Sequence, residues 1–205
     1  MHLISHDEGI SYGGQPYVFL DQPDPLLAPF AGAARPMYYH HFTDASLTNV
    51  MSGGVGFLSC GPLLTLSQTQ HIVAPCAHSN EVVAGGSNHS LLVPVVGLLQ
   101  EVHVQCGAVP PLYFDSKTTI FVSMDDAADK KSIWVRRRTI VLQEGTLMKD
   151  FVPLHIDEFN NVADMFTKFL PYDVWNRLVH YLLNRAGDPP ALPPRKQKIA
   201  DQRSS

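Results

Sequence analysis

Four acidic residues of the sequence are of the right type, and suitably placed, to bind divalent metal ions: Asp44, Glu81, Asp115 and Asp164. Two of them end runs of apolar and aromatic residues, and the other two lie near the start of stretches with helical spacing. In an α/β sheet, strand ends and helix starts gather at one rim. Four carboxylates gathered there would repel one another unless cations neutralised them, and hard oxygen ligands suit Mg²⁺ or Mn²⁺. Two such ions can align the attacking and leaving oxygens of a phosphodiester, so the acids predict a two-ion hydrolytic site.

Each of these acids also has an ordinary structural explanation. Aspartate is common in turns after strands, which would account for Asp44 and Asp115. Glu81 would serve equally as a solvated charge on a helix. Asp164 lies three residues after Asn161, in a first helical turn where the helix dipole favours an acid. The metal-site interpretation therefore depends on the four acids together and on their order.

The elements that must position the acids alternate between strand and helix. Strands are predicted over Met37–Asp44, Gly54–Cys60 and Leu63–Val73, with Gly61-Pro62 as the turn between the second and the third. A helix follows over Glu81–Val104, then a short strand over Leu112–Phe114 and helical spacing from Thr118 to Gly145. The last strand covers Phe151–Ile156. This alternation is typical of an α/β layer fold.

Two further features mark the helical regions. Asn160 or Asn161 is expected to cap the final helical region, and Pro171 to break it before an amphipathic stretch. Gly85, Gly86 and Pro94 count against the long helix, because glycine costs roughly 1 kcal/mol and proline about 3 kcal/mol relative to alanine inside a helix.

Composition sets the class of protein. The chain has 205 residues, of which 45% are hydrophobic and 17% charged, as expected for one globular domain. No run approaches the roughly 20 unbroken apolar residues of a membrane span, so we expect an intracellular protein without a membrane partner. The net charge of −4 confines contact with nucleic acid to local basic patches. One patch comprises Lys130, Lys131, Arg136, Arg137 and Arg138; a second lies near the C-terminus at Arg195, Lys196 and Lys198.

Histidine and cysteine carry little of the predicted chemistry. His40 and His41 are neighbours on a strand and point to opposite faces, so they cannot bind one ion together. The three cysteines, Cys60, Cys76 and Cys106, lack the spacing of a zinc site or a disulfide framework and are expected to be buried small side chains. No setting typical of a cysteine protease surrounds them.

Several segments resemble the ribonuclease H domain of copia-type retrotransposon polyproteins. Thr43-Asp44-Ala45-Ser46 with Ser52-Gly53-Gly54 is similar to the family's first acidic motif, and His78-Ser79-Asn80-Glu81 to its Ser-Ser-x-x-Glu helix start. Tyr113-Phe114-Asp115-Ser116 is similar to the third motif. The most specific match is Asn161 to Lys168, Asn-Val-Ala-Asp-Met-Phe-Thr-Lys, against Ala-Asp-x-x-Thr-Lys. Upstream, residues 6–14 resemble the end of the preceding reverse transcriptase.

The resemblance implies a ribonuclease H-like fold with a mixed five-stranded sheet, three antiparallel strands followed by parallel ones, flanked by helices. It implies that Asp44, Glu81, Asp115 and Asp164 are the catalytic residues and bind two Mg²⁺ or Mn²⁺ ions. The implied reaction is hydrolysis of the RNA strand of an RNA–DNA hybrid during reverse transcription. The implied partner is the reverse transcriptase portion of the same polyprotein, in a cytoplasmic virus-like particle or the nucleus.

The resemblance also assigns secondary roles and boundaries. His155, after the last strand, takes the place of a mobile histidine that aids product release, and the basic patch from Lys130 to Arg138 would bind the phosphates of the hybrid. Residues 1–36 are expected to be a reverse transcriptase remnant and Pro-rich connector, 37–184 the domain, and 185–205 a disordered basic tail. The alternative is a catalytically inactive retroelement fragment that keeps the fold and binds nucleic acid or protein; the glycines, Pro94 and the start within the reverse transcriptase favour it.

Overall fold

A computed structural model describes residues 38–59, 61–71, 76–104, 109–124 and 133–184. Its centre is a five-stranded sheet of order β3-β2-β1-β4-β5. The strands are β1 (Tyr39–Ser46), β2 (Met51–Leu58), β3 (Gly61–Thr69), β4 (Pro111–Phe114) and β5 (Val152–His155). β1, β2 and β3 are antiparallel neighbours, and β4 runs parallel to both β1 and β5. The expected mixed sheet is therefore confirmed.

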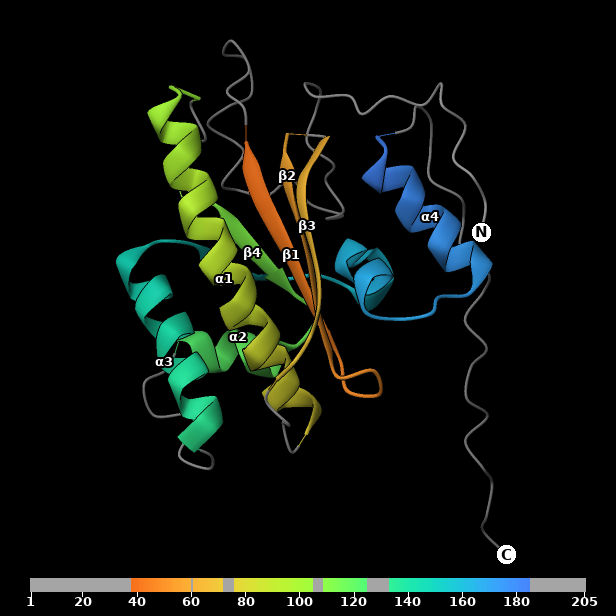
Figure 1. The fold of residues 1–205 in the computed structure, drawn as a ribbon, viewed down its shortest axis with the longest axis horizontal. Coiled ribbons are helices and arrows are strands. Elements are labelled where there is room, and N and C mark those ends of the chain that lie inside the picture. The colour runs from red at the N-terminus through yellow and green to blue at the C-terminus, as the bar shows by residue number, and fades with distance from the viewer. Residues whose placement is uncertain (1–37, 60, 72–75, 105–108, 125–132, 185–205) are drawn as a thin grey trace, which may run out of the picture.

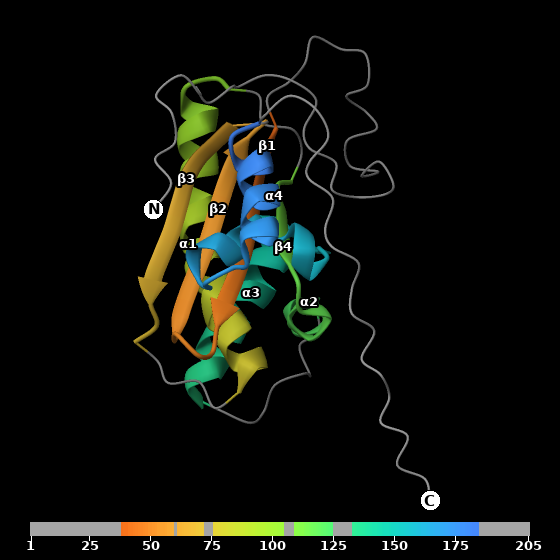
Figure 2. The ribbon, with the colours of Figure 1, turned by 90° about the vertical axis from the view of Figure 1, so that its right-hand side faces the viewer.

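Helices cover both faces of this sheet (Figures 1 and 2). On one face lie α1 (Ala77–Glu101), α2 (Lys117–Met124) and α3 (Ile133–Met148). On the other face lie the short 3₁₀ helix η3 (Val162–Phe166), which follows η2 (Glu158–Asn160), and the helix α4 (Tyr172–Leu182). Asn161 caps η3 and Pro171 precedes α4, as the sequence predicted.

Alternation along the strands divides the core into two layers. Leu112 and Phe114 of β4 pack with α1 and α3, whereas Tyr113, between them, packs with Phe42 and with Val162 of η3. This period of two is the reason both faces of the central strands are apolar. Asp44 and Asp115 continue the pattern two residues beyond Phe42 and Tyr113, so both belong to the face that η3 covers.

Several predicted boundaries shift. β1 extends two residues beyond Asp44, and β2 begins at Met51 rather than Gly54. Leu58 pairs with Gly61, so the connection lies between these two residues and Gly61-Pro62 belongs to β3. Ser59 has the positive φ of 55° that such a tight connection needs. The stretch from Thr118 to Gly145 contains two helices, α2 and α3, instead of one.

Helix α1 begins four residues before Glu81 and continues through Gly85, Gly86 and Pro94. Burial explains why it persists: Val82, Ala84 and Leu92 are fully buried against the sheet. Among the described residues, α1 is also the one helix long and apolar enough to cross a membrane, but half of its apolar window is buried inside the protein. Its composition therefore fits the core helix of this domain.

The glycine at position 85 is a packing requirement. A Cβ there would lie 2.7 Å from Cε1 of Phe114 and 3.2 Å from Cδ1 of Leu142, both fully buried. Gly85→Ala is therefore expected to lower the free energy of unfolding by about 1–2 kcal/mol, because overpacking outweighs the gain in helix propensity.

Gly97, on the same helix, is the matched control, since a Cβ there meets nothing within 4 Å. Gly97→Ala is expected to raise the free energy of unfolding by up to about 1 kcal/mol. Urea denaturation of both variants measures the difference, and equal effects would contradict the packing role of Gly85.

His40 and His41 are both buried, on opposite faces of β1, as expected. The His40 ring stacks on Phe57, with the centroids 5.2 Å apart. Burial, reinforced by the neighbouring His41, lowers the pKa of His40 to about 3. The unfolded chain therefore takes up the proton first, and His40 costs stability as pH falls below its ordinary value of 6.5.

His40→Phe keeps an aromatic ring in this position and removes the proton site. Its free energy of unfolding relative to the wild type is expected to rise by about 2 kcal/mol between pH 8 and pH 5. Urea denaturation at the two pH values checks this, and a difference independent of pH would show that His40 does not titrate as described.

Cys76 corrects one expectation. It was expected to be buried, but it is exposed at the position before the first residue of α1. A residue before a helix start lies at the edge of the packed layer, so no core surrounds it. Cys60 and Cys106 lie outside the described residues, as do the predicted segments 1–36 and 185–205.

Candidate metal centre

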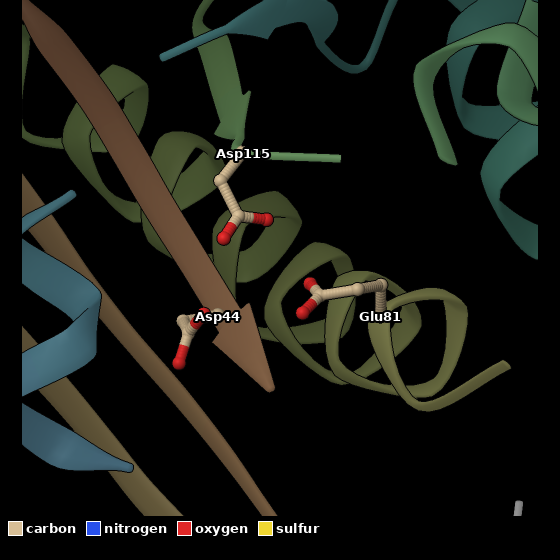
Figure 3. A group of neighbouring side chains, drawn as sticks. All are labelled: Asp44, Glu81 and Asp115. Carbon is tan, nitrogen blue, oxygen red and sulfur yellow. The ribbon is translucent and has the colours of Figure 1, made fainter. Parts of the chain in front are cut away.

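Asp44, Glu81 and Asp115 meet at one rim of the sheet. One carboxylate oxygen from each lies within 4.8 Å of the others. Figure 3 shows the Glu81 carboxyl group pointing toward Asp44 from α1, and the Asp115 carboxyl group pointing toward it from the end of β4. The three acids therefore converge as predicted. Glu81 lies in the second turn of α1 rather than at its start, but its carboxyl group still points toward the other two acids.

Burial and mutual repulsion make this cluster unfavourable without a cation. Burial, with the charges of Asp115 and Asp44, raises the pKa of Glu81 well above its ordinary value. Burial and the charge of Asp44 likewise raise the pKa of Asp115. The group thus favours either protons or a bound cation, which is the electrostatic condition expected of a metal site.

One carboxylate oxygen of Glu81 lacks a hydrogen-bond partner, and this bears on whether the residues present fit a metal ion. The Glu81 side chain is only 8% exposed, and its Oε2 atom is buried without a hydrogen-bond partner. Buried acceptors are rarely left in this condition. A divalent cation among three hard oxygen ligands would satisfy it, so the residues fit Mg²⁺ or Mn²⁺.

Asp164 lies beside Asp44, and Lys168 contacts both. The Nζ atom of Lys168 lies 3.1 Å from Oδ1 of Asp44 and 3.1 Å from Oδ1 of Asp164. The second oxygen of Asp44 accepts a hydrogen bond from the hydroxyl of Thr167. The fourth predicted acid therefore lies beside Asp44, which it contacts both directly and through the Lys168 ammonium.

Gly53 lets η3 approach the sheet closely enough to make these contacts. It pairs with Asp44 across β1 and β2, and a Cβ on it would lie 2.5 Å from Cγ2 of Thr167. Asn161 fixes the other end of η3, because its side-chain amide donates to the Thr43 carbonyl at 3.0 Å and its Oδ1 accepts from the Ala163 amide. The Asn161–Lys168 segment is thus anchored next to Asp44 at both ends.

Sequence reasoning assigned no role to Lys168, Thr167 or His78. The spacing of Asp164 and Lys168, four residues apart, was the available signal for an ion pair. His78 lies three residues before Glu81 on α1, and its Nδ1 is 3.5 Å from the hydroxyl of Thr119, the third residue of α2. This imidazole therefore connects the helix that carries Glu81 to the helix that follows Asp115.

The remaining predicted site residues lie around this centre or outside the described residues. His155 is exposed at the end of β5. It pairs in register with Phe114, the residue before Asp115 in the sequence. Arg136 and Arg137 are exposed on α3, whereas the aliphatic part of Arg138 lies against Gly86. Lys130 and Lys131 lie outside the described residues. Roles for these side chains in product release or phosphate binding stay predictions.

A mixed sheet of order β3-β2-β1-β4-β5 with helices on both faces has the strand order and directions of a ribonuclease H-like fold. No model of a known protein family and no curated protein matches the sequence.

Three solved structures that align with the chain are ribonucleases H. LC11-RNase H1, isolated from compost by a metagenomic approach, is 15% identical, with a TM-score of 0.49 over 63% of this chain and 91% of that chain. RNase H1 from Halobacterium salinarum NRC-1 is 18% identical, with a TM-score of 0.43 over 63% and 93%. The N-terminal RNase H domain of rv2228c from Mycobacterium tuberculosis is 13% identical, with a TM-score of 0.39 over 64% and 89%. Similarity this low does not bear on chemistry, so the description of the fold rests on strand order and direction.

Proposed function

We propose that this protein is a metal-dependent ribonuclease H that hydrolyses the RNA strand of RNA–DNA hybrids. The observation that carries the proposal is the Asp44–Glu81–Asp115 cluster, with one oxygen of each acid within 4.8 Å of the others and with Oε2 of Glu81 buried without a hydrogen-bond partner. Among common reactions, hydrolysis of a phosphodiester with metal assistance is the one that needs several acids and few other groups.

The roles of the side chains follow from their contacts. Asp44, Glu81 and Asp115 would hold the divalent ions, and Asp164 would complete the set in the substrate complex. Bound Mg²⁺ or Mn²⁺ ions would neutralise charge on the phosphodiester and align the attacking water with the leaving oxygen. Thr167 and Lys168 fix the orientation of the Asp44 carboxylate by contacting one oxygen each.

We further propose that the domain acts in the reverse transcription of a copia-type retrotransposon. What supports this is the order of the acidic motifs and the Asn161–Lys168 segment, which contacts Asp44 directly. The proposed partners are the RNA–DNA hybrid, with Lys130, Lys131 and Arg136 to Arg138 on its phosphates, and the reverse transcriptase portion of the polyprotein. The proposed location is intracellular, in a virus-like particle or the nucleus.

The competing interpretation is an inactive fragment, and two of the sequence features that favour it have a structural explanation. Gly85 and Gly86 were counted against the long helix, but both lie where another side chain approaches closely. The helix that carries Glu81 is continuous through both glycines.

Purified protein is expected to cut the RNA strand of a labelled hybrid in Mg²⁺ or Mn²⁺ and to be inactive in EDTA. The physical reason is that the cluster acids need a cation to neutralise them. Gel analysis should show products with 5′-phosphate and 3′-hydroxyl ends. Duplex DNA of the same sequence is the matched control substrate. Cleavage that persists in EDTA, or a folded sample that leaves the hybrid intact in both metals, would overturn the proposed function.

A further inference from the structure

The four acids of the site are not equivalent, because they form two groups that share Asp44. Lys168 lies between Asp44 and Asp164, 3.1 Å from an oxygen of each. Glu81 and Asp115 join Asp44 in the three-acid cluster without Asp164. Asp44 therefore belongs to both groups, and Asp164 contacts it both directly and through the Lys168 ammonium.

These contacts place the Lys168 ammonium against two buried carboxylates. Asp44 is fully buried and Asp164 is 4% exposed, whereas the Lys168 side chain is 32% exposed. The stem of Lys168 thus extends from the surface to two buried carboxylates. Burial alone would lower the pKa of Lys168, but the charges of Asp44 and Asp164 outweigh it and raise that pKa above its ordinary value. A lysine in this position carries a permanent positive charge.

Charge counting shows what the ammonium does for metal binding. Metal binding requires the acids to be ionised, and in that state four carboxylates and one ammonium leave three negative charges without compensation. One divalent ion reduces this excess to one negative charge, whereas two divalent ions would reverse it to one positive charge. A second ion beside Asp44 and Asp164 would also lie next to the Lys168 ammonium, and like charges within a few ångströms in a buried site repel strongly.

We propose that Lys168 occupies the position of the second cation, so that the free protein binds a single divalent ion at Asp44, Glu81 and Asp115. The inference deepens the proposed function and rests on it. In this arrangement Asp164 is not a metal ligand of the free protein. It becomes available to a second ion when Lys168 leaves it, and the anionic phosphates of the hybrid are the groups to which a partly exposed lysine can turn.

The test counts bound Mn²⁺ by electron paramagnetic resonance in the full chain without nucleic acid, so it does not depend on turnover. The wild type is expected to bind one ion and Lys168→Met two. Loss of the ammonium should tighten the second ion by at least about 10-fold, equivalent to removing roughly 1.4 kcal/mol of repulsion.

Asp164 variants identify where the second ion binds. Asp164→Asn is expected to bind one ion with unchanged affinity, and the double variant Asp164→Asn, Lys168→Met also one. Lys149→Met, which removes an exposed lysine after α3, is the matched control and should bind one. If Lys168→Met does not fold, Lys168→Gln tests the same loss of charge, and Lys168→Arg should keep the wild-type count.

The outcomes separate this inference from the function on which it rests. Two ions of similar affinity in the wild type, or one ion in every Lys168 variant, would overturn the role of Lys168 and leave the metal site standing. No ion bound by the wild type, or binding unaffected by Asp115→Asn, would overturn the metal site itself and the inference with it.

Discussion

Replacing Asp115 by Asn is expected to lower hybrid cleavage by more than about 100-fold while leaving the domain folded. The change removes one ligand charge from the three-acid cluster but keeps the shape of the side chain. Removing even an outer partner of a metal ligand typically costs 10- to 100-fold, so loss of a ligand should cost more. Because burial and the charge of Asp44 raise the pKa of Asp115, loss of its carboxylate also removes a source of repulsion. The variant should therefore be at least as stable as the wild type.

Single-turnover cleavage of a labelled hybrid in saturating Mg²⁺ measures the first effect and urea denaturation the second. Asp173→Asn is the matched control, because Asp173 is exposed in the first turn of α4. It should cleave at the wild-type rate. Undiminished cleavage by Asp115→Asn would show that a different acid holds the metal.

Replacing Asn88 by Ala is expected to lower the free energy of unfolding by about 3–5 kcal/mol. Asn88 is fully buried and connects α1 to two strands. Its Oδ1 lies 2.9 Å from Nε2 of His41, and its Nδ2 donates to the Thr43 hydroxyl and to the Gly53 carbonyl. Truncation would leave three buried polar partners unsatisfied, at roughly 1–3 kcal/mol each, reduced where neighbours rearrange.

Asn80 provides the matched control on the same helix. It is 1% exposed, like Asn88, but neither atom of its side-chain amide has a hydrogen-bond partner. Asn80→Ala should therefore change the free energy of unfolding by less than about 1 kcal/mol. Urea denaturation measures both variants, and similar losses at the two positions would show that the Asn88 hydrogen bonds contribute little.

The sheet and the acids were predictable because each depends on local pattern. The continuous apolar run Leu112–Phe114 and the aromatic stretch before Asp44 indicate strands, and Asp44 and Asp115 follow them. The helix start was less accessible, since Ser79 and Asn80 are preferred capping residues, whereas the observed N-cap, Cys76, makes no side-chain cap hydrogen bond. Gly85 looked unfavourable because its local cost is visible in the sequence, whereas its contacts with Phe114 and Leu142 are not.

The contacts within the site were predictable only in part, because they too are not visible in the local sequence. The four acids were recognised as a group from their motifs, but a motif gives the order of residues and not their pairing. That Lys168 lies between Asp44 and Asp164 depends on how closely η3 approaches β2, which Gly53 controls. Similarly, the network around Asn88 joins residues 35 to 47 positions apart, and no sequence spacing indicates such contacts.

Gly53 and Gly54 are neighbours on β2, yet they face different layers of the protein. A side chain at Gly53 would strike Thr167, whereas one at Gly54 would lie 1.7 Å from Oδ1 of Asn88. Substitutions at these adjacent positions therefore act through separate contacts, one beside the acidic cluster and one in the core. A relative of this domain that no longer needs the proposed activity should tolerate change at position 53 while still rejecting it at position 54. The pattern of substitution at these two positions among such relatives would therefore distinguish domains that still need the site from those that need only the fold.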